Sequence, residues 1–282
     1  MYQNVYYEKE GGIIHCWDDT KGYFTKKYRN YAYVRDGNGA HESINGERLK
    51  KINFWKNEDN LKLYESDVNE MTRFLIDEYG DSDEVSDGHV IMTFDIEVEM
   101  NSWLPDTDKA ENTITSVAFH DSATNDYYAY VLSEGEEINK TIKGAKVRSF
   151  RTEEDMLVAF VNAWEEISAT IITGWNIDFF DVTYLYNRLK RVLGTKQANR
   201  LSPIGKVHWN KYRKRYLIAG VSALDYIALF KNFTYTEYPN YRLDTIAKLE
   251  LGRGKIEYEG NLDQLFRDDI EKFVEYNLVD VE

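Results

Sequence analysis

The apolar residues between positions 89 and 99 are closely spaced and mostly β-branched or aromatic, in the run HVIMTFDIEVE. A short run of this kind is typical of a buried strand. Asp95 and Glu97 lie within it, two residues apart. Because side chains alternate along a strand, we expect both carboxylates on the same face of a sheet. Like charges there repel one another, so the pattern indicates either a polar edge strand or a site for a divalent cation.

The residues before this strand predict a small α+β domain. Tyrosine-rich segments with strand-like composition alternate with turns that contain glycine, and residues 67–79 have the spacing of a helix. An acidic stretch at 81–87 reads as a loop or linker. We therefore place a domain boundary near residue 88, with one domain over residues 1–88 and a second over 89–282. The strands expected in the first domain are 2–7, 13–17 and 31–34.

The residues after the first strand predict a sheet covered by helices. An amphipathic pattern at 152–168 predicts a helix that Thr152 can cap. Strand and helix patterns then alternate, which favours an α/β fold whose mixed sheet begins antiparallel and becomes parallel. The other expected elements are strands at 113–120, 127–132 and 170–175, helices at 182–194, 242–251 and 268–281, a hairpin at 206–217, and a strand end followed by a helix at 221–230. We expect Gly252 to end the helix at 242–251.

Composition fits a soluble globular protein, with 282 residues, 43% hydrophobic and 30% charged. The single cysteine, Cys16, excludes an internal disulfide and a cysteine-based zinc site. No apolar run approaches the length of a membrane span, and the N-terminus does not resemble a signal peptide. We expect a cytoplasmic protein with no membrane partner.

Charge is distributed unevenly along the chain. The net charge of −14 argues against a nucleic-acid partner, yet residues 182–224 contain ten lysines and arginines and no acidic residue. This segregation predicts either a solvated basic face or a surface for a polyanion. The basic hairpin at 206–217 supplies half of these charges, together with the aromatic residues Trp209, Tyr212 and Tyr216.

Further carboxylates stand where they can converge on the first strand. Asp181 lies where a buried strand ends and a helix begins, the usual place for ligands in open α/β sheets. Tyr276 and Asp280 are four residues apart, and so share one face of the last expected helix. Four carboxylates and a phenol suit a two-metal phosphodiesterase, because Mg²⁺ and Mn²⁺ prefer carboxylate oxygens.

These motifs resemble the 3′–5′ exonuclease domain of family B DNA polymerases, most closely those of T-even-type bacteriophages. Residues 94–97 (FDIE) are similar to the first exonuclease motif, and Asn176, Phe180 and Asp181 to the second. Tyr276 and Asp280 are similar to the third. Gly254-Lys255 resembles the site of a lysine that reaches the scissile phosphate or the attacking water. The resemblance covers residues 88–282 and is faint before them.

The resemblance implies a ribonuclease H-like domain that removes mispaired nucleotides from primer 3′ ends. Asp95, Glu97, Asp181 and Asp280 would hold two divalent ions, Mg²⁺ or Mn²⁺. Tyr276 would orient the attacking water and Lys255 would assist electrostatically. The hairpin resembles a loop that separates the primer strand. Single-stranded or frayed primer-template DNA is the implied substrate, contacted by Lys206, Trp209, Lys211, Tyr212, Arg213, Lys214, Arg215, Phe180 and Asn176.

The polymerase palm, fingers and thumb of this family are not expected in the sequence. Segments at 79–83 (YGDSD) and 105–108 (PDTD) lack the flanking apolar strands of a palm motif. We therefore expect a truncated piece or a natural half of a split polymerase, with the polymerase half and replication proteins as partners. Two alternatives stay open: a nucleic-acid-binding or regulatory module, and an exoribonuclease of the same superfamily.

Overall fold

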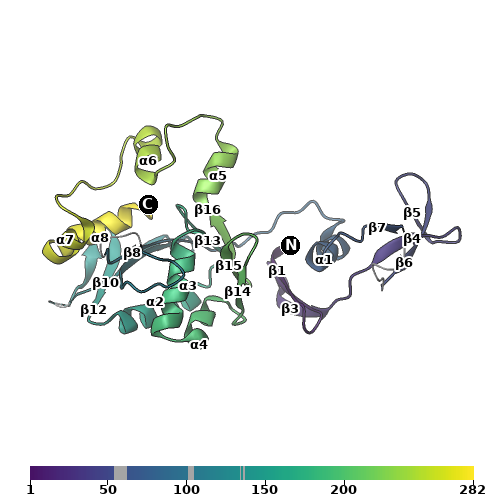
Figure 1. Ribbon diagram of the computed structural model, residues 1–282, viewed down its shortest axis with the longest axis horizontal. Helices are drawn as coiled ribbons and strands as arrows, with labels where there is room; N and C mark the ends of the chain where they lie inside the picture. The colour runs from purple at the N-terminus through teal and green to yellow at the C-terminus, as the bar shows by residue number, and fades with distance from the viewer. Residues whose placement is uncertain (54–61, 101–104, 134, 136) are drawn as a thin grey trace. The chain divides into compact units, whose positions relative to one another are not determined.

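The computed structural model describes residues 1–53, 62–100, 105–133, 135 and 137–282. It divides the chain into two compact units, Met1–Gly88 and His89–Glu282, shown in Figure 1. The division coincides with the boundary expected from the acidic linker. Among the described residues, no helix is both long enough and apolar enough to span a membrane.

The first unit contains two antiparallel sheets and one helix. The strands β1 (Tyr2–Glu8), β2 (Ile13–Asp18) and β3 (Gly22–Lys27) pair in that order, and α1 (Glu70–Tyr79) packs on them through a core that includes Ile14, Cys16 and Phe74, all fully buried. The second sheet has the order β5-β6-β4-β7, formed by β4 (Ala32–Arg35), β5 (His41–Glu42), β6 (Arg48–Ile52) and β7 (Leu63–Tyr64).

This unit contains more strands than the apolar pattern predicted. Strands were expected only where β1, β2 and β4 are found. The additional strands β3, β5, β6 and β7 are short or mostly exposed, with sequences such as GYFTKK, so they carry little hydrophobic periodicity. Pairing with a neighbouring strand, rather than their own burial, defines them.

The second unit is built on a seven-stranded mixed sheet of order β11-β12-β10-β9-β8-β13-β16. The first three strands along the chain, β8, β9 and β10, form the expected antiparallel meander. Strands β13 and β16 extend the sheet in parallel beside β8. The strands are β8 (Ile91–Val98), β9 (Ile114–Asp121), β10 (Asp126–Leu132), β11 (Asn139–Ile142), β12 (Ala145–Phe150), β13 (Ile171–Gly174) and β16 (Ser222–Asp225). The pair β11 and β12 was not expected, because half of its residues are polar and exposed.

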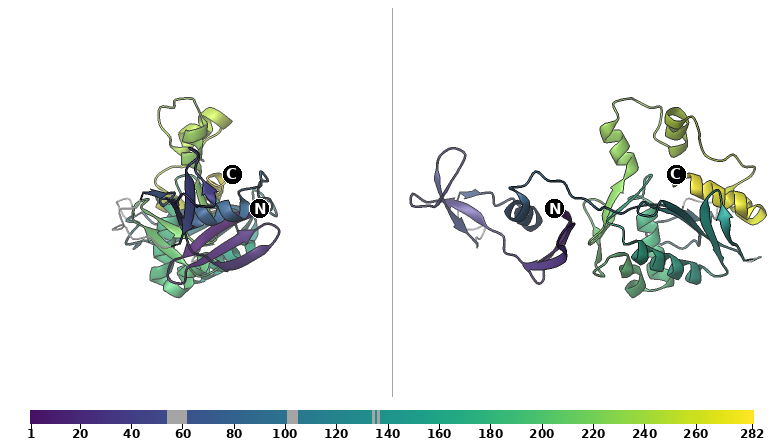
Figure 2. Two further views of the ribbon diagram at one scale, coloured as in Figure 1. Left: turned by 90° about the vertical axis from the view of Figure 1, so that its right-hand side faces the viewer. Right: turned by 180° about the vertical axis from the view of Figure 1, so that it is seen from behind.

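Helices cover both faces of this sheet (Figures 1 and 2). One face packs on α2 (Glu153–Ile167) and α3 (Asp181–Val192), with Phe94, Phe160 and Leu185 in the core between them. The opposite face packs on α7 (Leu262–Asp268) and α8 (Ile270–Val279). The side chain of Thr152 accepts a hydrogen bond from the Asp155 amide, so it caps α2 as expected.

The C-terminal helix expected at 268–281 is α8, and α7, which precedes it, was not expected. Asp269 leaves the helical conformation, with φ −148° and ψ 79°, and its side chain accepts a hydrogen bond from the Lys272 amide. An aspartate that caps the second helix therefore ends the first one.

Between α3 and α7 the chain forms smaller elements. The hairpin of β14 (Val207–Asn210) and β15 (Arg215–Ile218) lies where the basic segment predicted it. It is preceded by α4 (Thr195–Ala198) and a 3₁₀ turn (Asn199–Leu201) and followed by α5 (Tyr226–Phe233) and α6 (Leu243–Leu251). Gly252, with φ +67°, ends α6 as expected.

Candidate active site

Strand β8 separates an apolar face from an acidic one. Met92, Phe94 and Ile96 alternate into the core below α2 and α3. Asp95 and Glu97 therefore point to the opposite face, where α8 lies, and both are only partly buried. The prediction that the two carboxylates share a face is confirmed.

The last helix brings a third carboxylate to this face. Asp280 is the C-cap residue of α8, which packs on β8, β9 and β10 through Phe273, Val274 and Leu278. One carboxylate oxygen from each of three residues, Asp95, Glu97 and Asp280, lies within 4.8 Å of the others. The packing of α8 therefore brings residues that are far apart in the sequence into contact; Asn277 and Asp95, for example, are 182 positions apart and share a hydrogen bond.

The fourth expected carboxylate, Asp181, lies beside this cluster and is not part of it. Strand β13 pairs with β8 only as far as Thr173, and the chain then turns through residues 175–180 into α3. Asp181 is the first residue of α3, and its Oδ1 atom accepts a hydrogen bond from the Ile96 amide at 3.2 Å. Its side chain therefore continues, in place of a backbone carbonyl, the pairing that β13 no longer provides.

Two features hold this turn against β8. A Cβ atom on Gly174 would lie 2.6 Å from the carbonyl oxygen of Phe94, so only glycine permits this approach of β13 to β8. The buried carboxylate of Asp225, at the end of β16, accepts hydrogen bonds from the amides of Asn176 at 2.9 Å and Asp178 at 3.3 Å. Asn176 has a positive φ of 69°, which asparagine tolerates better than most residues.

The carboxylates oppose one another's ionisation. Burial, followed by the charges of the other carboxylates, raises the pKa of Asp95 well above its ordinary value. Burial raises the pKa of Glu97 to about 8 and that of Asp181 to about 7. Burial also raises the pKa of Asp280, although the Lys255 ammonium opposes this increase. The cluster of Asp95, Glu97 and Asp280, with Asp181 beside it, is a donor set that suits a divalent cation.

Lys255 and Tyr276 stand at the edge of the cluster. The Lys255 ammonium donates hydrogen bonds to the Tyr276 hydroxyl at 3.0 Å and to Asp280, with which it forms an ion pair. The backbone amide of Lys255 donates to Asp244 at 2.8 Å, which holds this segment in place. Burial raises the pKa of Tyr276 to about 12, so its hydroxyl keeps its proton at neutral pH.

A hydrogen-bonded pair behind Asp95 escaped assignment from the sequence. The side-chain amide of Asn277 donates to Asp95 Oδ2 at 2.8 Å and accepts from the Ser116 hydroxyl at 2.7 Å. Asn277 follows Tyr276 in the third motif, which was the only sequence signal for it. Ser116 lies inside the apolar run of β9, where a small polar residue gives no signal of a role.

The residues expected to contact DNA divide into two groups. Tyr212 at the hairpin tip is 99% exposed, and Trp209 is 38% exposed. Arg215 instead forms an ion pair with Asp178, in the turn that precedes Asp181. The lysines and arginines at positions 211, 213 and 214 are exposed at the tip, whereas Lys206 is partly buried at the base.

The second motif contributes to a cavity beside Glu97. Phe180 stacks on Tyr184, with ring centroids 5.5 Å apart, and lines a cavity of about 500 Å³ with Glu97, Tyr258 and Asn261. Asn176 lies in the turn before α3 and is not one of the residues that line this cavity.

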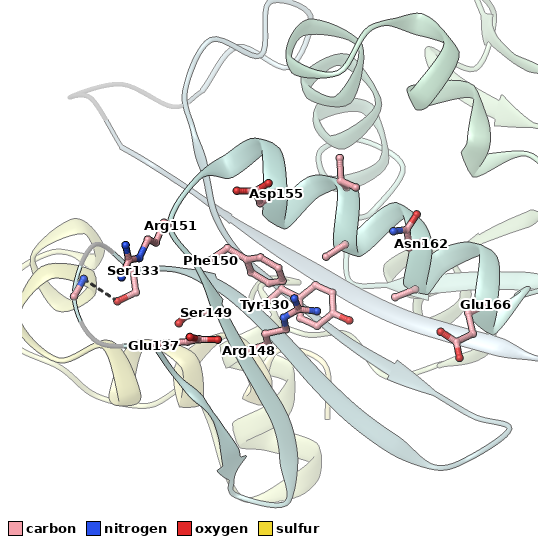
Figure 3. Close-up of a pocket in the computed structure, with 14 residues that line it drawn as sticks. Tyr130, Ser133, Glu137, Arg148, Ser149, Phe150, Arg151, Asp155, Asn162 and Glu166 are labelled. Atoms are coloured by element: carbon pink, nitrogen blue, oxygen red, sulfur yellow. Dashed lines mark hydrogen bonds between the residues drawn. The ribbon is translucent and has the colours of Figure 1, made fainter.

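Another cavity, of about 610 Å³, lies between α2 and β12, away from the carboxylates (Figure 3). Arg148 and Arg151 line it, but so do Glu137, Asp155 and Glu166. Because the acids outnumber the arginines, this cavity is not suited to an anionic ligand. The carboxylate cluster is therefore the candidate active site.

The sheet and the acidic cluster together define a class of enzyme. A mixed sheet with helices on both faces, whose inner strand presents two carboxylates to a third on the last helix, is the ribonuclease H-like arrangement of metal-dependent nucleases. Comparison with known proteins assigns the family. Residues 78–246 match the model of the DNA polymerase family B exonuclease domain. The chain belongs to this family and contains its metal-dependent 3′–5′ exonuclease domain.

Similar curated proteins are DNA polymerases. The DNA-directed DNA polymerase of Escherichia phage RB69 is 32% identical over 219 residues, which is 68% of this chain and 24% of that protein. The DNA-directed DNA polymerase of Enterobacteria phage T4 is 32% identical over 238 residues, or 74% of this chain and 26% of that protein. DNA polymerase 1 of Saccharolobus solfataricus is 27% identical over 258 residues. The chain spans about a quarter of the length of these relatives.

Proposed function

We propose that the protein removes mispaired nucleotides from the 3′ ends of DNA primers, as the proofreading part of a family B DNA polymerase. The observation that supports this proposal is the cluster of three carboxylate oxygens within 4.8 Å, which forms an ion pair with a single lysine, Lys255, in the part of the chain that the structure describes. Because the cluster is made of carboxylates, it attracts cations, and a phosphate would approach it only with cations bound. The similarity to DNA-directed DNA polymerases supports a DNA substrate and a role beside a polymerase.

We assign cation binding to Asp95, Glu97, Asp181 and Asp280. The donor set fits two divalent ions, Mg²⁺ or Mn²⁺, because all of its ligands are carboxylate oxygens. When bound, such ions supply an activated water and neutralise the charge that develops on the phosphate and on the leaving 3′ oxygen. The raised pKa values of the carboxylates indicate that the protein alone leaves this charge uncompensated.

Tyr276 and Lys255 have complementary roles in this proposal. The ammonium of Lys255 donates to the Tyr276 oxygen, so the phenol proton is directed away from the lysine. Tyr276 can therefore donate its own hydrogen bond to the attacking water and orient it. Lys255 also contributes a positive charge beside the scissile phosphate.

The hairpin and the cavity beside Glu97 would bind the DNA strand. Exposed lysines and arginines at the tip attract the phosphate backbone, and Tyr212 can stack on an unpaired base. Phe180 lines the cavity next to a proposed metal ligand, where a terminal nucleotide must lie for hydrolysis. Frayed or single-stranded 3′ ends are thus the proposed substrate.

The proposal is tested by incubating a 5′-labelled single-stranded DNA oligonucleotide with Mg²⁺. We expect a ladder shortened from the 3′ end. Asp95→Ala should abolish this ladder while the protein stays folded by circular dichroism. Glu154→Ala, which removes an exposed carboxylate on α2, is the matched control and should cleave normally. Equal cleavage by the Asp95 variant would show that the site is wrongly assigned.

The same assay separates the two alternatives. A matched RNA oligonucleotide degraded faster than DNA would indicate an exoribonuclease. A regulatory, nucleic-acid-binding role would be favoured by tight RNA binding that needs no metal and survives loss of all four carboxylates. As partners we propose the polymerase half and replication proteins. As the compartment we propose the cytoplasm, which is that of an infected host cell if a phage encodes the protein.

A further inference from the structure

A neutral chain of hydrogen bonds connects the two strands that lie under the carboxylates. Asn277 on α8 has no exposed surface, and neither does Ser116 on β9. The Asn277 amide nitrogen donates to Asp95 Oδ2 at 2.8 Å, and its carbonyl oxygen accepts from the Ser116 hydroxyl at 2.7 Å. In the β8–β9 register Ser116 stands opposite Glu97. The chain therefore runs from beside one proposed metal ligand to the side chain of another.

The chemistry of the pair determines which way the amide points. When a cation is bound, Asp95 is ionised and only accepts hydrogen bonds, so the nitrogen of Asn277 faces it. The hydroxyl of Ser116 then donates to the amide oxygen and prevents the side chain from turning. Both ends of the amide are satisfied, which a fully buried polar group requires.

A neutral donor is what this position needs. A lysine or arginine in contact with Asp95 would neutralise the carboxylate and take the place of a cation, as Lys255 partly does at Asp280. An amide instead holds one oxygen of Asp95 and leaves the charge of the cluster unchanged. The second oxygen then has one defined direction.

We propose that Asn277, held by Ser116, is a positioning residue that fixes the Asp95 carboxylate for binding a divalent cation. The proposal rests on the metal site assigned above. Neither Asn277 nor Ser116 contacts a cation in this proposal; both act through Asp95. Partners of this kind typically change metal affinity or activity by about 10–100-fold when they are removed.

The test measures binding of Mn²⁺ alone to the 282-residue chain, by electron paramagnetic resonance of the unbound ion. We expect Asn277→Ala and Ser116→Ala each to weaken Mn²⁺ binding by about 10–100-fold. Asn187→Ala is the matched control. Asn187 also bonds at both ends of its amide, to the Thr107 carbonyl and the Tyr216 hydroxyl, but it does not contact the carboxylates. Its loss should leave Mn²⁺ binding unchanged.

Exonuclease kinetics provide a second measurement. Both variants should require about 10–100-fold more Mn²⁺ for half-maximal activity and recover most of the maximal rate at saturating Mn²⁺. A purely structural role would instead lower the rate at every metal concentration. If Asn277→Ala fails to fold, Ser116→Ala decides the question.

The outcomes separate this proposal from the metal site itself. If the wild-type chain does not bind Mn²⁺, the proposed metal site is wrong. If the wild type binds Mn²⁺ and digests DNA, while a folded Ser116→Ala or Asn277→Ala variant binds Mn²⁺ equally well, only the positioning role is overturned.

Discussion

At the scale of single residues, the carboxylates of β8 oppose the folding of the metal-free protein. Each is ionised in the unfolded chain at neutral pH, whereas burial and neighbouring charges favour its protonated form in the folded state. This repulsion is useful to a metal site, because a cation relieves it. The same charges that we propose bind the metal therefore destabilise the protein when metal is absent.

A pH titration of stability should reveal this conflict. The pKa of Glu97 is about 8 and that of Asp181 about 7 in the folded protein, both above their unfolded values. Between pH 5 and pH 8, roughly, the folded state thus binds more protons, and stability must fall as the pH rises. In EDTA, thermal unfolding should occur at lower temperature at pH 8 than at pH 5.5. Addition of Mg²⁺ or Mn²⁺ at pH 8 should reverse the difference, and an unchanged melting temperature would contradict the electrostatic account.

Glu97→Gln should stabilise the metal-free protein and inactivate it. The amide keeps the shape of the side chain but removes one repelling charge. About 1 kcal/mol of added stability would raise the melting temperature of a domain of this size by roughly 2–4 °C. Calorimetry in EDTA at pH 8 measures the increase, and exonuclease assays measure the loss. Glu154→Gln on the exposed face of α2 should change neither.

At the scale of elements, the site depends on where strands end. Strand β13 stops at Gly174. Because of this early end, the Ile96 amide donates its hydrogen bond to the Asp181 carboxylate. Asp181 could be recognised from the sequence as a residue that follows a strand, but its contact with a backbone amide could not. Such a contact depends on the exact register and length of the neighbouring strand.

Gly174→Ala should impair activity more than stability. The added methyl group would meet the Phe94 carbonyl at 2.6 Å and the Ile177 side chain at 2.5 Å, so β8 must shift next to Asp95. Overpacking of this kind costs about 1–3 kcal/mol. Denaturant unfolding measures the change in stability, and exonuclease assays at about 20 °C measure the change in activity. Gly37→Ala, where a methyl group meets nothing within 4 Å, is the control and should be neutral.

The hairpin of β14 and β15 is expected to act on frayed duplex ends. Tyr212→Ala removes a side chain that is 99% exposed, so stability should not change. Loss of one stacked base costs about 1–3 kcal/mol, and digestion of a mismatched primer end should slow by about tenfold. Tyr235→Ala is the control, because Tyr235 is equally exposed on a segment outside the basic hairpin. Equal rates for both variants would exclude a stacking role for the tip.

The sequence predicted the local features of this fold better than the distant ones. The alternation of β8, the Thr152 cap and the glycine that ends α6 follow from neighbouring residues, and all are confirmed. Strands β11 and β12 were missed, because β11 is mostly polar and becomes a strand only by pairing with β12, which pairs in turn with β10. The position of Ser116 opposite Glu97 required the sheet register, which no local pattern contains.

At the scale of the whole molecule, charge is segregated between the hairpin and the rest of the chain. The protein carries a net charge of −14, yet the exposed residues at 211, 213 and 214 are all basic. A polyanion should therefore approach the second unit by way of the hairpin. Elsewhere the acidic surface repels it.

Salt dependence tests this expectation. A triple substitution, Lys211→Ala, Arg213→Ala and Lys214→Ala, should weaken binding of single-stranded DNA and reduce its dependence on salt. Each lost phosphate contact lowers the slope of log K against log salt by about 0.7. Fluorescence anisotropy in EDTA between about 50 and 200 mM NaCl measures the slope. If the slope is unchanged, the strand is bound elsewhere.

The division into two units gives the single cysteine a practical use. Cys16 is fully buried between the β1–β3 sheet and α1, so a thiol reagent can reach it only when the first unit opens. The residues proposed for the exonuclease site, in contrast, all lie in the second unit. The rate of thiol labelling and the loss of activity in increasing urea would thus follow the two units independently. Coincident transitions would show that the units unfold as one cooperative body, and separate transitions that each has its own stability.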